Sequence, residues 1–234
     1  MKLKTLLKNA SLSEDALEQI KEAITKAEKN TSGEICIALT AESSSYSFWE
    51  LNAALCTSFA LFVCIFPMAP QIYSWLEKIF WGTEPWYLLA FYVITCAAFT
   101  FFLSLLFNIP WIDRLVIPKK VMKKAVTARA MRHFTEGGVY CTKEHSGVLI
   151  FISWFEKEVR ILADKGISQK ISGDLWKIIA DELTENLSKG NIKDAFVNSI
   201  EKCGALLAEN YPAAQEKTNQ LNDDLIILED EPWA

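Results

Sequence analysis

The sequence predicts a three-layer α/β/α domain that is interrupted by a hairpin of two transmembrane helices. Uncharged stretches run from Leu51 to Leu76 and from Pro85 to Ile112, and each is longer than the roughly 20 apolar residues that a helix needs to cross a bilayer. On both sides of these stretches, apolar residues recur at the spacings of amphipathic helices and strands. Neither flanking piece can bury a core alone, so we expect them to fold together.

The predicted spans are residues 51–70 and 86–109, within a hairpin of residues 49–114. Two buried core helices are the alternative interpretation, but such helices usually carry a polar stripe, whereas apolar residues cover all sides here. Because Pro67, Pro70 and Pro85 can end helices, we expect a short connecting loop over residues 69–85. No span residue is charged, which argues against an ion pathway.

Basic residues are concentrated before the first span and after the second, whereas the connecting loop carries Lys78 against Glu77 and Glu84. This asymmetry predicts that both termini are cytoplasmic. Tryptophans mark the expected head-group levels, and lysines that follow the second span are expected to reach the anionic leaflet. The predicted membrane-interface residues are Trp49, Trp75, Trp86, Trp111, Lys119, Lys120, Lys123 and Lys124.

The first flanking piece, residues 11–45, predicts one helix followed by one strand. Ser11 and Glu14 fit a capping box, and apolar residues then recur at helical spacing up to Asn30. Residues 34–39 alternate with the period of a strand.

The second flanking piece, residues 117–212, predicts a basic helix, a strand hairpin and two amphipathic helices. The run from Val148 to Trp154 is nearly all apolar, as in a central strand covered on both faces. Because a long connection separates it from the first strand, a parallel right-handed crossover is expected. Residues 213–234 form an acidic tail without periodicity, predicted to be flexible, with Leu225 to Leu228 as a partner-binding or aggregation-prone patch.

Three motifs resemble the TPM domain, named for thylakoid-lumen, photosystem assembly and modulator proteins: "NTSGEICIAL", "SGVLIFIS" and "KEVRILADKGI". The similarity covers most of residues 11–212 outside the spans, and it is greatest to a bacterial variety with a two-helix hairpin inserted after the first strand. The resemblance implies an α/β/α sandwich tied to the bacterial inner membrane. Some members are described as acid phosphatases or calcium binders, and others as auxiliary or repair factors of membrane complexes.

Two predicted sites follow from the loops and from this resemblance. Glu34 and Asp164 could flank a cleft that holds Ca²⁺ or Mg²⁺; the alternative is an exposed strand-edge charge and a turn-shaping residue. Many members have Asp-Asn-Gly where this chain has a histidine, a serine and a glycine, which weakens a cation site. The predicted binding residues are His145, Arg160 and Lys165, although Arg160 could instead be a solvent-facing partner of Glu158.

A net charge of −5 excludes a nucleic-acid binder, which would need a basic face. No nucleophile pattern for hydrolysis is visible. We therefore expect a membrane-anchored, non-enzymatic binding, assembly or quality-control factor for another membrane protein at the cytoplasmic face. The alternatives are a metal-dependent, acid-phosphatase-like hydrolase and a subunit of an oligomeric membrane complex, including a homo-oligomer.

Overall fold

The computed structural model describes residues 12–107, 109–142, 145–213 and 219–228. The chain divides into two compact units. Residues 45–119 form the first, which we call the hairpin unit. The residues before and after it form the second, which we call the sheet unit.

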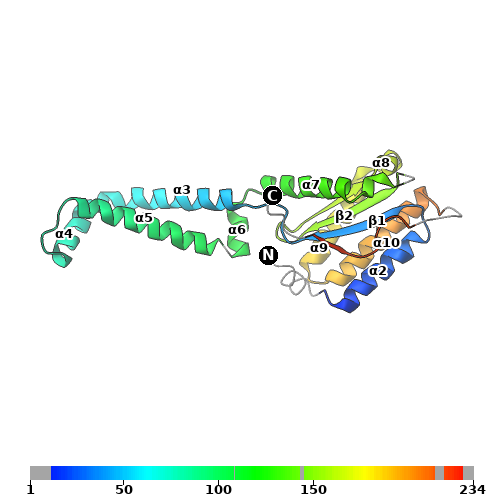
Figure 1. Ribbon diagram of the computed structural model, residues 1–234, viewed down its shortest axis with the longest axis horizontal. Coiled ribbons are helices and arrows are strands. Elements are labelled where there is room, and N and C mark those ends of the chain that lie inside the picture. The colour runs from blue at the N-terminus through cyan, green and yellow to red at the C-terminus, as the bar shows by residue number, and fades with distance from the viewer. Residues whose placement is uncertain (1–11, 108, 143–144, 214–218, 229–234) are drawn as a thin grey trace. The chain divides into compact units, whose positions relative to one another are not determined.

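The sheet unit is built on four strands in the order β3-β2-β1-β4 (Figure 1). The strands are β1 (Glu34–Thr40), β2 (Gly147–Ser153), β3 (Glu158–Ala163) and β4 (Ile226–Leu228). β1 and β2 pair in parallel, from Glu34 opposite Gly147 to Thr40 opposite Ser153. β2 and β3 form an antiparallel hairpin, and β4 runs parallel to β1. The predicted parallel pairing across the inserted hairpin is therefore confirmed.

Helices cover both faces of this sheet (Figure 1). They are α2 (Glu14–Glu28), α9 (Gly173–Ser188) and α10 (Ile192–Asn210) on one face, and α7 (Lys119–Glu136) on the other. The odd-numbered residues of β1 pack with the first group of helices, and Cys36 and Ala38 pack with α7. Both faces of β1 and β2 are covered, which explains why the residues inside these strands are apolar. The predicted three-layer α/β/α class is confirmed.

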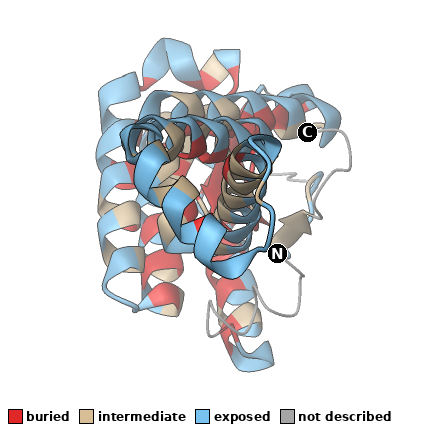
Figure 2. Ribbon diagram, turned by 90° about the vertical axis from the view of Figure 1, so that its left-hand side faces the viewer, coloured by how far each residue is buried: buried red, intermediate tan, exposed pale blue. Residues whose placement is uncertain are grey.

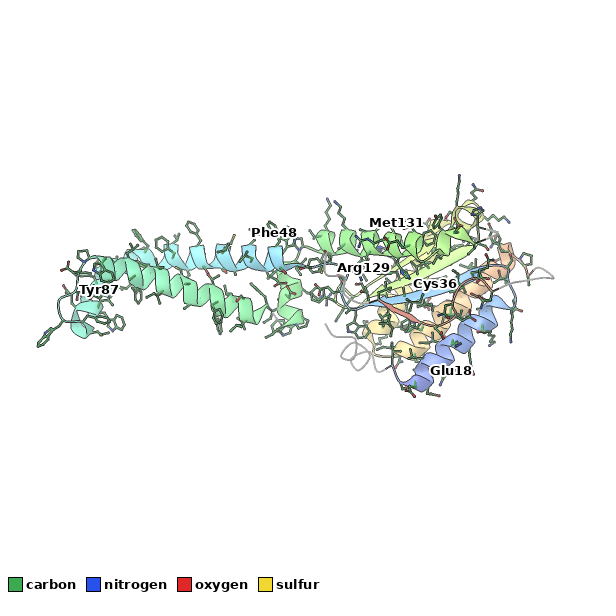
Figure 3. All side chains as sticks on the ribbon, in the orientation of Figure 1. Glu18, Cys36, Phe48, Tyr87, Arg129 and Met131 are labelled. Atoms are coloured by element: carbon green, nitrogen blue, oxygen red, sulfur yellow. The ribbon has the colours of Figure 1, made fainter. Side chains whose placement is uncertain are left out.

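Burial makes Cys36 chemically inert. Its thiol is buried on the α7 side of the sheet. Arg129 of α7 is buried on the same side (Figure 3). Desolvation, and secondly the charge of Glu28, raise the pKa of the Cys36 thiol to about 12. Because the thiolate is the reactive form, this cysteine is a packing residue.

The hairpin unit contains α3 (Ser47–Ile65) and α5 (Trp86–Leu106), which pack against each other. Phe48 and Tyr87, which begin these two helices, lie at opposite ends of the hairpin (Figure 3). Ser58 Oγ lies 2.6 Å from Thr100 Oγ1 across the contact. The Tyr92 hydroxyl donates to the carbonyls of Ile65 and Phe66, each at 3.3 Å.

Most other side chains of the hairpin point outward, so Figure 2 shows its helices, which face the viewer, largely in the colours of exposed and intermediate residues. Both helices are long and apolar enough to cross a membrane. The exposed large apolar residues of α3 and α5 include Leu51, Leu55, Phe59, Val63, Leu89, Val93, Ile94, Phe101, Phe102 and Leu105.

The connection between the long helices differs from the expected loop. Residues 69–85 were predicted to form a loop, but α4 (Ala69–Ile79) occupies most of them and is preceded by a short 3₁₀ helix (Phe66–Met68). Pro70 lies in the first turn of α4, where proline is well accommodated because the missing N–H would have no partner there. A proline therefore marked a helix start here, not a loop.

The structure also differs from the sequence patterns in the cap of α2 and in several short helices. Ser13 caps α2 by accepting from the N–H of Ala16, whereas the predicted cap, Ser11, lies outside the described residues. The short elements are α6 (Pro110–Val116), a 3₁₀ helix (Val139–Cys141) and α8 (Lys165–Lys170).

The tail departs most clearly from its prediction. Residues 213–234 were expected to lack regular structure, but within the described part β4 pairs with the end of β1. Leu225 and Ile227 pack against the core on the α2 side, and Ile226 and Leu228 against the core on the α7 side. This alternation is that of a sheet strand, which is too short for its period to stand out in the sequence.

Candidate functional site

Three predicted loop residues gather at the edge of the sheet where β1 and β2 begin. Glu34 opens β1, His145 precedes β2, and Asp164 follows β3. Glu34 is the register partner of Gly147 in β2, and the Asp164 N–H donates to the Gly147 carbonyl at 2.9 Å. β2 lies between β1 and β3, so the two acids border the same residue from opposite sides.

Glu34 holds the C-terminal segment of the chain. Its side chain is buried, and Oε2 accepts the backbone N–H groups of Gln220 at 3.2 Å and Leu221 at 3.1 Å. A buried carboxylate needs such donors, because removing it from water is costly. The interpretation of Glu34 as an exposed strand-edge charge is therefore wrong.

Asp164 and His145 form a pair. Asp164 caps α8 by accepting the Lys165 N–H on Oδ1 at 2.5 Å, so Lys165 and Gly166 begin a helix where the alternative interpretation expected a turn. The other oxygen, Oδ2, lies 3.3 Å from His145 Nδ1. The carboxylate is almost fully buried, whereas the imidazole is 71% exposed. A buried carboxylate thus lies beside an accessible imidazole at this edge, and its Oδ2 atom makes no hydrogen bond to any residue that the structure describes.

Two glycines allow the backbone to approach closely around this pair. A Cβ at Gly147 would lie 2.0 Å from the carbonyl oxygen of Val139, and one at Gly166 would lie 2.5 Å from that of His145. His145 itself has a φ of 50°, a left-handed conformation that is uncommon outside glycine. The loop that carries His145 is therefore shaped by its neighbours on both sides.

The other two predicted binding residues have local partners. Arg160 Nη1 lies 2.9 Å from Glu158 Oε1, and Arg160 Nε donates to Thr127 Oγ1 on α7 at 3.1 Å. Lys165 contributes its backbone N–H to the Asp164 cap. The contacts of Arg160 match the alternative that pairs it with Glu158, while anion binding by Arg160 and Lys165 stays a prediction.

Tyr211, which the sequence analysis did not single out, lies at the same edge. Its carbonyl accepts from the Ser32 N–H at 3.0 Å, and Lys170 Nζ lies 4.1 Å from the centre of its ring. Burial, and secondly the negative charge of Asp164, raise the pKa of the Tyr211 hydroxyl. Its position after α10 carried no periodic signal, and its closeness to Asp164 arises from the folded chain.

Metal binding at this edge has limited support from the side chains. Among the described residues, no three His, Cys, Asp or Glu side chains group closely enough to hold one ion. Ca²⁺ takes about six to eight oxygen ligands and Mg²⁺ demands near-octahedral geometry. Since Glu34 bonds to the tail and Asp164 caps α8, a shared Ca²⁺ or Mg²⁺ site on these acids stays a prediction.

A second polar cluster, at the opposite end of β1 and β2, was not predicted. Ser43 Oγ lies 2.7 Å from Ser153 Oγ, which donates to Glu156 Oε2 at 2.5 Å, and the Ser43 N–H donates to Glu156 Oε1 at 2.9 Å. All three residues are buried. Burial removes the hydroxyls from any substrate in solution, so the cluster holds the exit of β1 immediately before the hairpin unit begins in the sequence.

The exposure of the predicted membrane-interface residues can be compared within each unit, while their contact with lipid stays a prediction. Trp49 is half-buried and the others are exposed: Trp75, Trp86, Trp111, Lys119, Lys120, Lys123 and Lys124.

Comparisons with known proteins agree with the resemblance read from the motifs. Residues 114–206 match the family model of the TPM domain. The NMR structure of the BA42 protein from the psychrophilic bacterium Bizionia argentinensis is similar in fold, with a TM-score of 0.54 and 22% sequence identity over 92% of this chain and 94% of that one. No curated protein matches the chain.

At 22% identity the structural similarity concerns the fold alone. The matched residues 114–206 contain α7, the β2–β3 hairpin, α9 and most of α10, and in the folded protein β1 and α2 join them in one sheet and one core. The predicted resemblance to the TPM domain is therefore confirmed over residues 114–206.

Proposed function

We propose that the hairpin unit anchors this TPM domain in the bacterial inner membrane with both termini in the cytoplasm. There the domain acts as a non-enzymatic binding, assembly or quality-control factor for another membrane protein.

Outward apolar surface supports the membrane anchor. In the most apolar windows of the two candidate spans, 11% and 6% of the residues are buried. Core helices of a soluble protein bury their apolar residues, because exposure to water costs about 25 cal/mol per Å² of apolar surface. Lipid removes that cost. The polar side chains inside the hairpin bond to each other or to carbonyls, as with Ser58, Thr100 and Tyr92, which suits an apolar solvent.

Topology mapping tests the anchor. Reporters that distinguish the two compartments are fused at residue 1 and residue 234 and inserted after Gly82, between α4 and α5. We expect cytoplasmic signals from both ends and a periplasmic signal from the insertion. Ends in opposite compartments would contradict the proposal, because β1 and β2 lie on either side of the hairpin in sequence and pair in one sheet.

The observation that carries the binding role is the contact between Glu34 and the tail. A buried carboxylate that receives two backbone N–H groups from an extended segment, beside a strand that pairs with that segment, is the chemistry by which sheet edges bind peptides. A residue chosen as a metal ligand on sequence grounds therefore has partners that favour a role in polypeptide binding.

Crosslinking in native membranes tests this role. The full-length chain is crosslinked, purified under denaturing conditions and compared with Glu34→Gln, with Glu158→Gln as a matched control on β3. We expect the wild type and the control to capture a membrane protein, and Glu34→Gln to capture a smaller amount of it. Capture that is no higher than from membranes lacking the chain would overturn the binding role.

The His145–Asp164 pair favours one alternative, phosphatase-like hydrolysis. An exposed imidazole 3.3 Å from a buried carboxylate is a pair of groups that could take part in general acid–base catalysis. The full-length chain can be assayed on a generic phosphomonoester with Mg²⁺ or Ca²⁺. Activity lost in His145→Gln and kept in His133→Gln would favour this alternative. Activity unaffected by His145→Gln and by Asp164→Asn would remove these residues from it.

A further inference from the structure

Residues 219–228, which we call the tail segment, occupy the edge of β1 in a way that resembles a bound peptide. β4 pairs with the last three of the seven residues of β1, namely Ala38, Leu39 and Thr40. Ahead of this ladder, the backbone N–H groups of Gln220 and Leu221 donate to Glu34 Oε2. In Figure 1 the segment is the red strand beside β1. The segment thus runs parallel to β1 and contacts it at both ends.

Charge complementarity accompanies the backbone pairing. Asp223 Oδ2 accepts from Thr25 Oγ1 at 2.7 Å, and Asp224 Oδ1 lies 3.0 Å from Lys21 Nζ, both on α2. The hydrogen bond and charge of Asp224 raise the pKa of the Lys21 ammonium group. The acidic pair therefore sets the segment against the basic, polar side of α2.

Apolar side chains of the segment enter both core layers. Leu225 and Ile227 pack against the core on the α2 side, and Leu221, Ile226 and Leu228 against the core on the α7 side. The edge of β1 thus recognises a defined pattern, in which two acidic residues precede a run of branched aliphatic residues.

The tail segment is nevertheless held weakly, because its strand ladder is short and its ion pair is exposed to solvent. The β4 ladder is three residues long, and each of its residues is only partly buried. The Lys21 and Asp224 side chains are 45% and 54% exposed, and exposed ion pairs contribute little to stability. Short, solvated edge elements open at low free energy cost.

The first part of the same edge is protected by another device. The Ile35 N–H donates to Glu28 Oε1 at 2.7 Å, so a buried acid at the end of α2 satisfies the backbone where β4 does not reach. At the start of the β1 edge, Glu28 therefore accepts the backbone N–H of Ile35. At its end, the tail segment pairs with the strand. Covering of this kind limits unspecific strand pairing.

We propose that the edge of β1 between Glu34 and Thr40 is a peptide-binding site for an extended acidic–aliphatic segment of a partner protein, and that the tail segment fills it in cis as an exchangeable competitor. This proposal deepens the binding role above and rests on it. The partner peptide inserts parallel to β1, with its acidic residues facing Lys21 and Thr25 and its N-terminal N–H groups on Glu34.

A labelled peptide of the tail segment sequence, NQLNDDLIIL, is the probe. It is titrated into the detergent-solubilised full chain and into a variant that ends at Ala213 and keeps the hairpin unit. A tethered competitor has an effective concentration in the millimolar range, so we expect the truncated chain to bind the peptide at least about tenfold more tightly. A peptide with Ile226→Ser and Ile227→Ser should not bind.

Charge reversal tests the register. Lys21→Glu in the truncated chain should weaken binding by about threefold, as expected for an exposed ion pair, and a peptide carrying Asp224→Lys should restore it. Lys26→Glu is the matched control on the same helix, because Lys26 pairs with Glu201 at 3.6 Å and not with the tail segment. Equal effects of Lys21→Glu and Lys26→Glu would contradict the proposed placement.

Hydrogen exchange on the intact chain keeps the proposal testable if the truncated chain fails to fold. Amides of β4 should exchange at least about a hundredfold faster than those of β2, as expected for local opening that costs roughly 3 kcal/mol less. Equal protection of β4 and β2 would overturn the proposal, and so would a folded truncated chain that does not bind the peptide.

Two further outcomes are distinguishable. Copurification of differently tagged copies that the peptide abolishes would identify a second copy of this chain as the occupant and overturn the choice of a separate partner. Failure of peptide binding with an unchanged topology and an unchanged crosslinked partner would refute this site alone. Loss of the topology or of the crosslinked partner would instead refute the proposed function.

Discussion

β2 in the sheet unit and α5 in the hairpin unit are both nearly continuous apolar runs, yet their side chains have opposite environments. All seven residues of β2 are buried, whereas Tyr92 is the one buried residue among the 21 of α5. β2 has helices on both faces of its sheet, whereas α5 packs along α3, contacts α4 at one end and leaves its other sides open. Apolar composition therefore does not say where a side chain lies; the number of covered faces does.

Polar groups in the two regions follow the same rule. In the sheet unit, buried carboxylates such as Glu28 and Glu34 accept backbone N–H groups. Between α3 and α5 of the hairpin unit, the inward polar groups Ser58, Thr100 and Tyr92 are hydroxyls, and they bond to each other or to helix carbonyls. Charged groups survive burial in a domain surrounded by water because many backbone donors are available, whereas a helix pair has already used its backbone donors.

The largest expected difference between the regions concerns truncation of a phenylalanine. Phe151 in β2 is fully buried, and Phe101 in α5 is 66% exposed. Phe151→Ala should lower the free energy of unfolding of the sheet unit by about 3–5 kcal/mol, because it leaves a cavity. Phe101→Ala leaves none and should cost well under half as much. Denaturant unfolding of the full chain in detergent measures both, and equal losses would contradict the comparison.

The second-largest expected difference between the two units concerns the introduction of a charged residue. Phe101→Asp should disfavour insertion of α5 by about 2.5–3.5 kcal/mol, the range for a charge near the centre of a span. Ile178, which is 60% exposed on α9, provides the control in the sheet unit, where Ile178→Asp should stay within about 0.5 kcal/mol. The fraction of chain in carbonate-washed membranes reports insertion. Full retention of Phe101→Asp would argue that α5 does not lie in lipid.

The contact between α3 and α5 should show a smaller effect. Ser58→Ala removes the bond to Thr100, and interhelical hydrogen bonds in membranes contribute about 0.6–1.7 kcal/mol. Thr57→Ala is the matched control, because the Thr57 hydroxyl bonds to the Ala53 carbonyl of its own helix. A double-mutant cycle of Ser58→Ala and Thr100→Val in mixed detergent measures the coupling, and a value near zero would remove this bond as a determinant of hairpin stability.

The smallest effect concerns pH. Burial, and secondly the positive charge of Arg129, lower the pKa of His133 in α7. A lowered folded-state pKa means that the unfolded chain binds the proton more readily. Stability is therefore retained above the ordinary histidine pKa of about 6.5 and is lost as pH falls through the lower folded-state value. His133→Gln should reduce the fall in melting temperature between neutral and acidic pH, and an unchanged fall would contradict this assignment.

Much of the fold was predictable because the hydrophobic period of a long helix or strand can be recognised in the sequence. The central strand from Val148, the basic helix and the two C-terminal helices form where their patterns indicated. Pro70 shows the limit of single-residue signals, since it begins α4 inside a stretch expected to be a loop. At the predicted site, His145 and Asp164 are neighbours and the carboxylate of Glu34 binds the tail segment, while the roles assigned to these residues stay predictions.

Residue order alone determined that two long uncharged stretches interrupt an α/β pattern and that the TPM-like motifs continue after them, because length, charge and period are local properties of a chain. Tertiary structure decided the burial of Glu34, which bonds to Gln220 across 186 positions of the chain, and the docking of β4 on β1. A three-residue strand carries too little period to be read in advance, and its pairing depends on an edge that exists only once β1 and β2 have met.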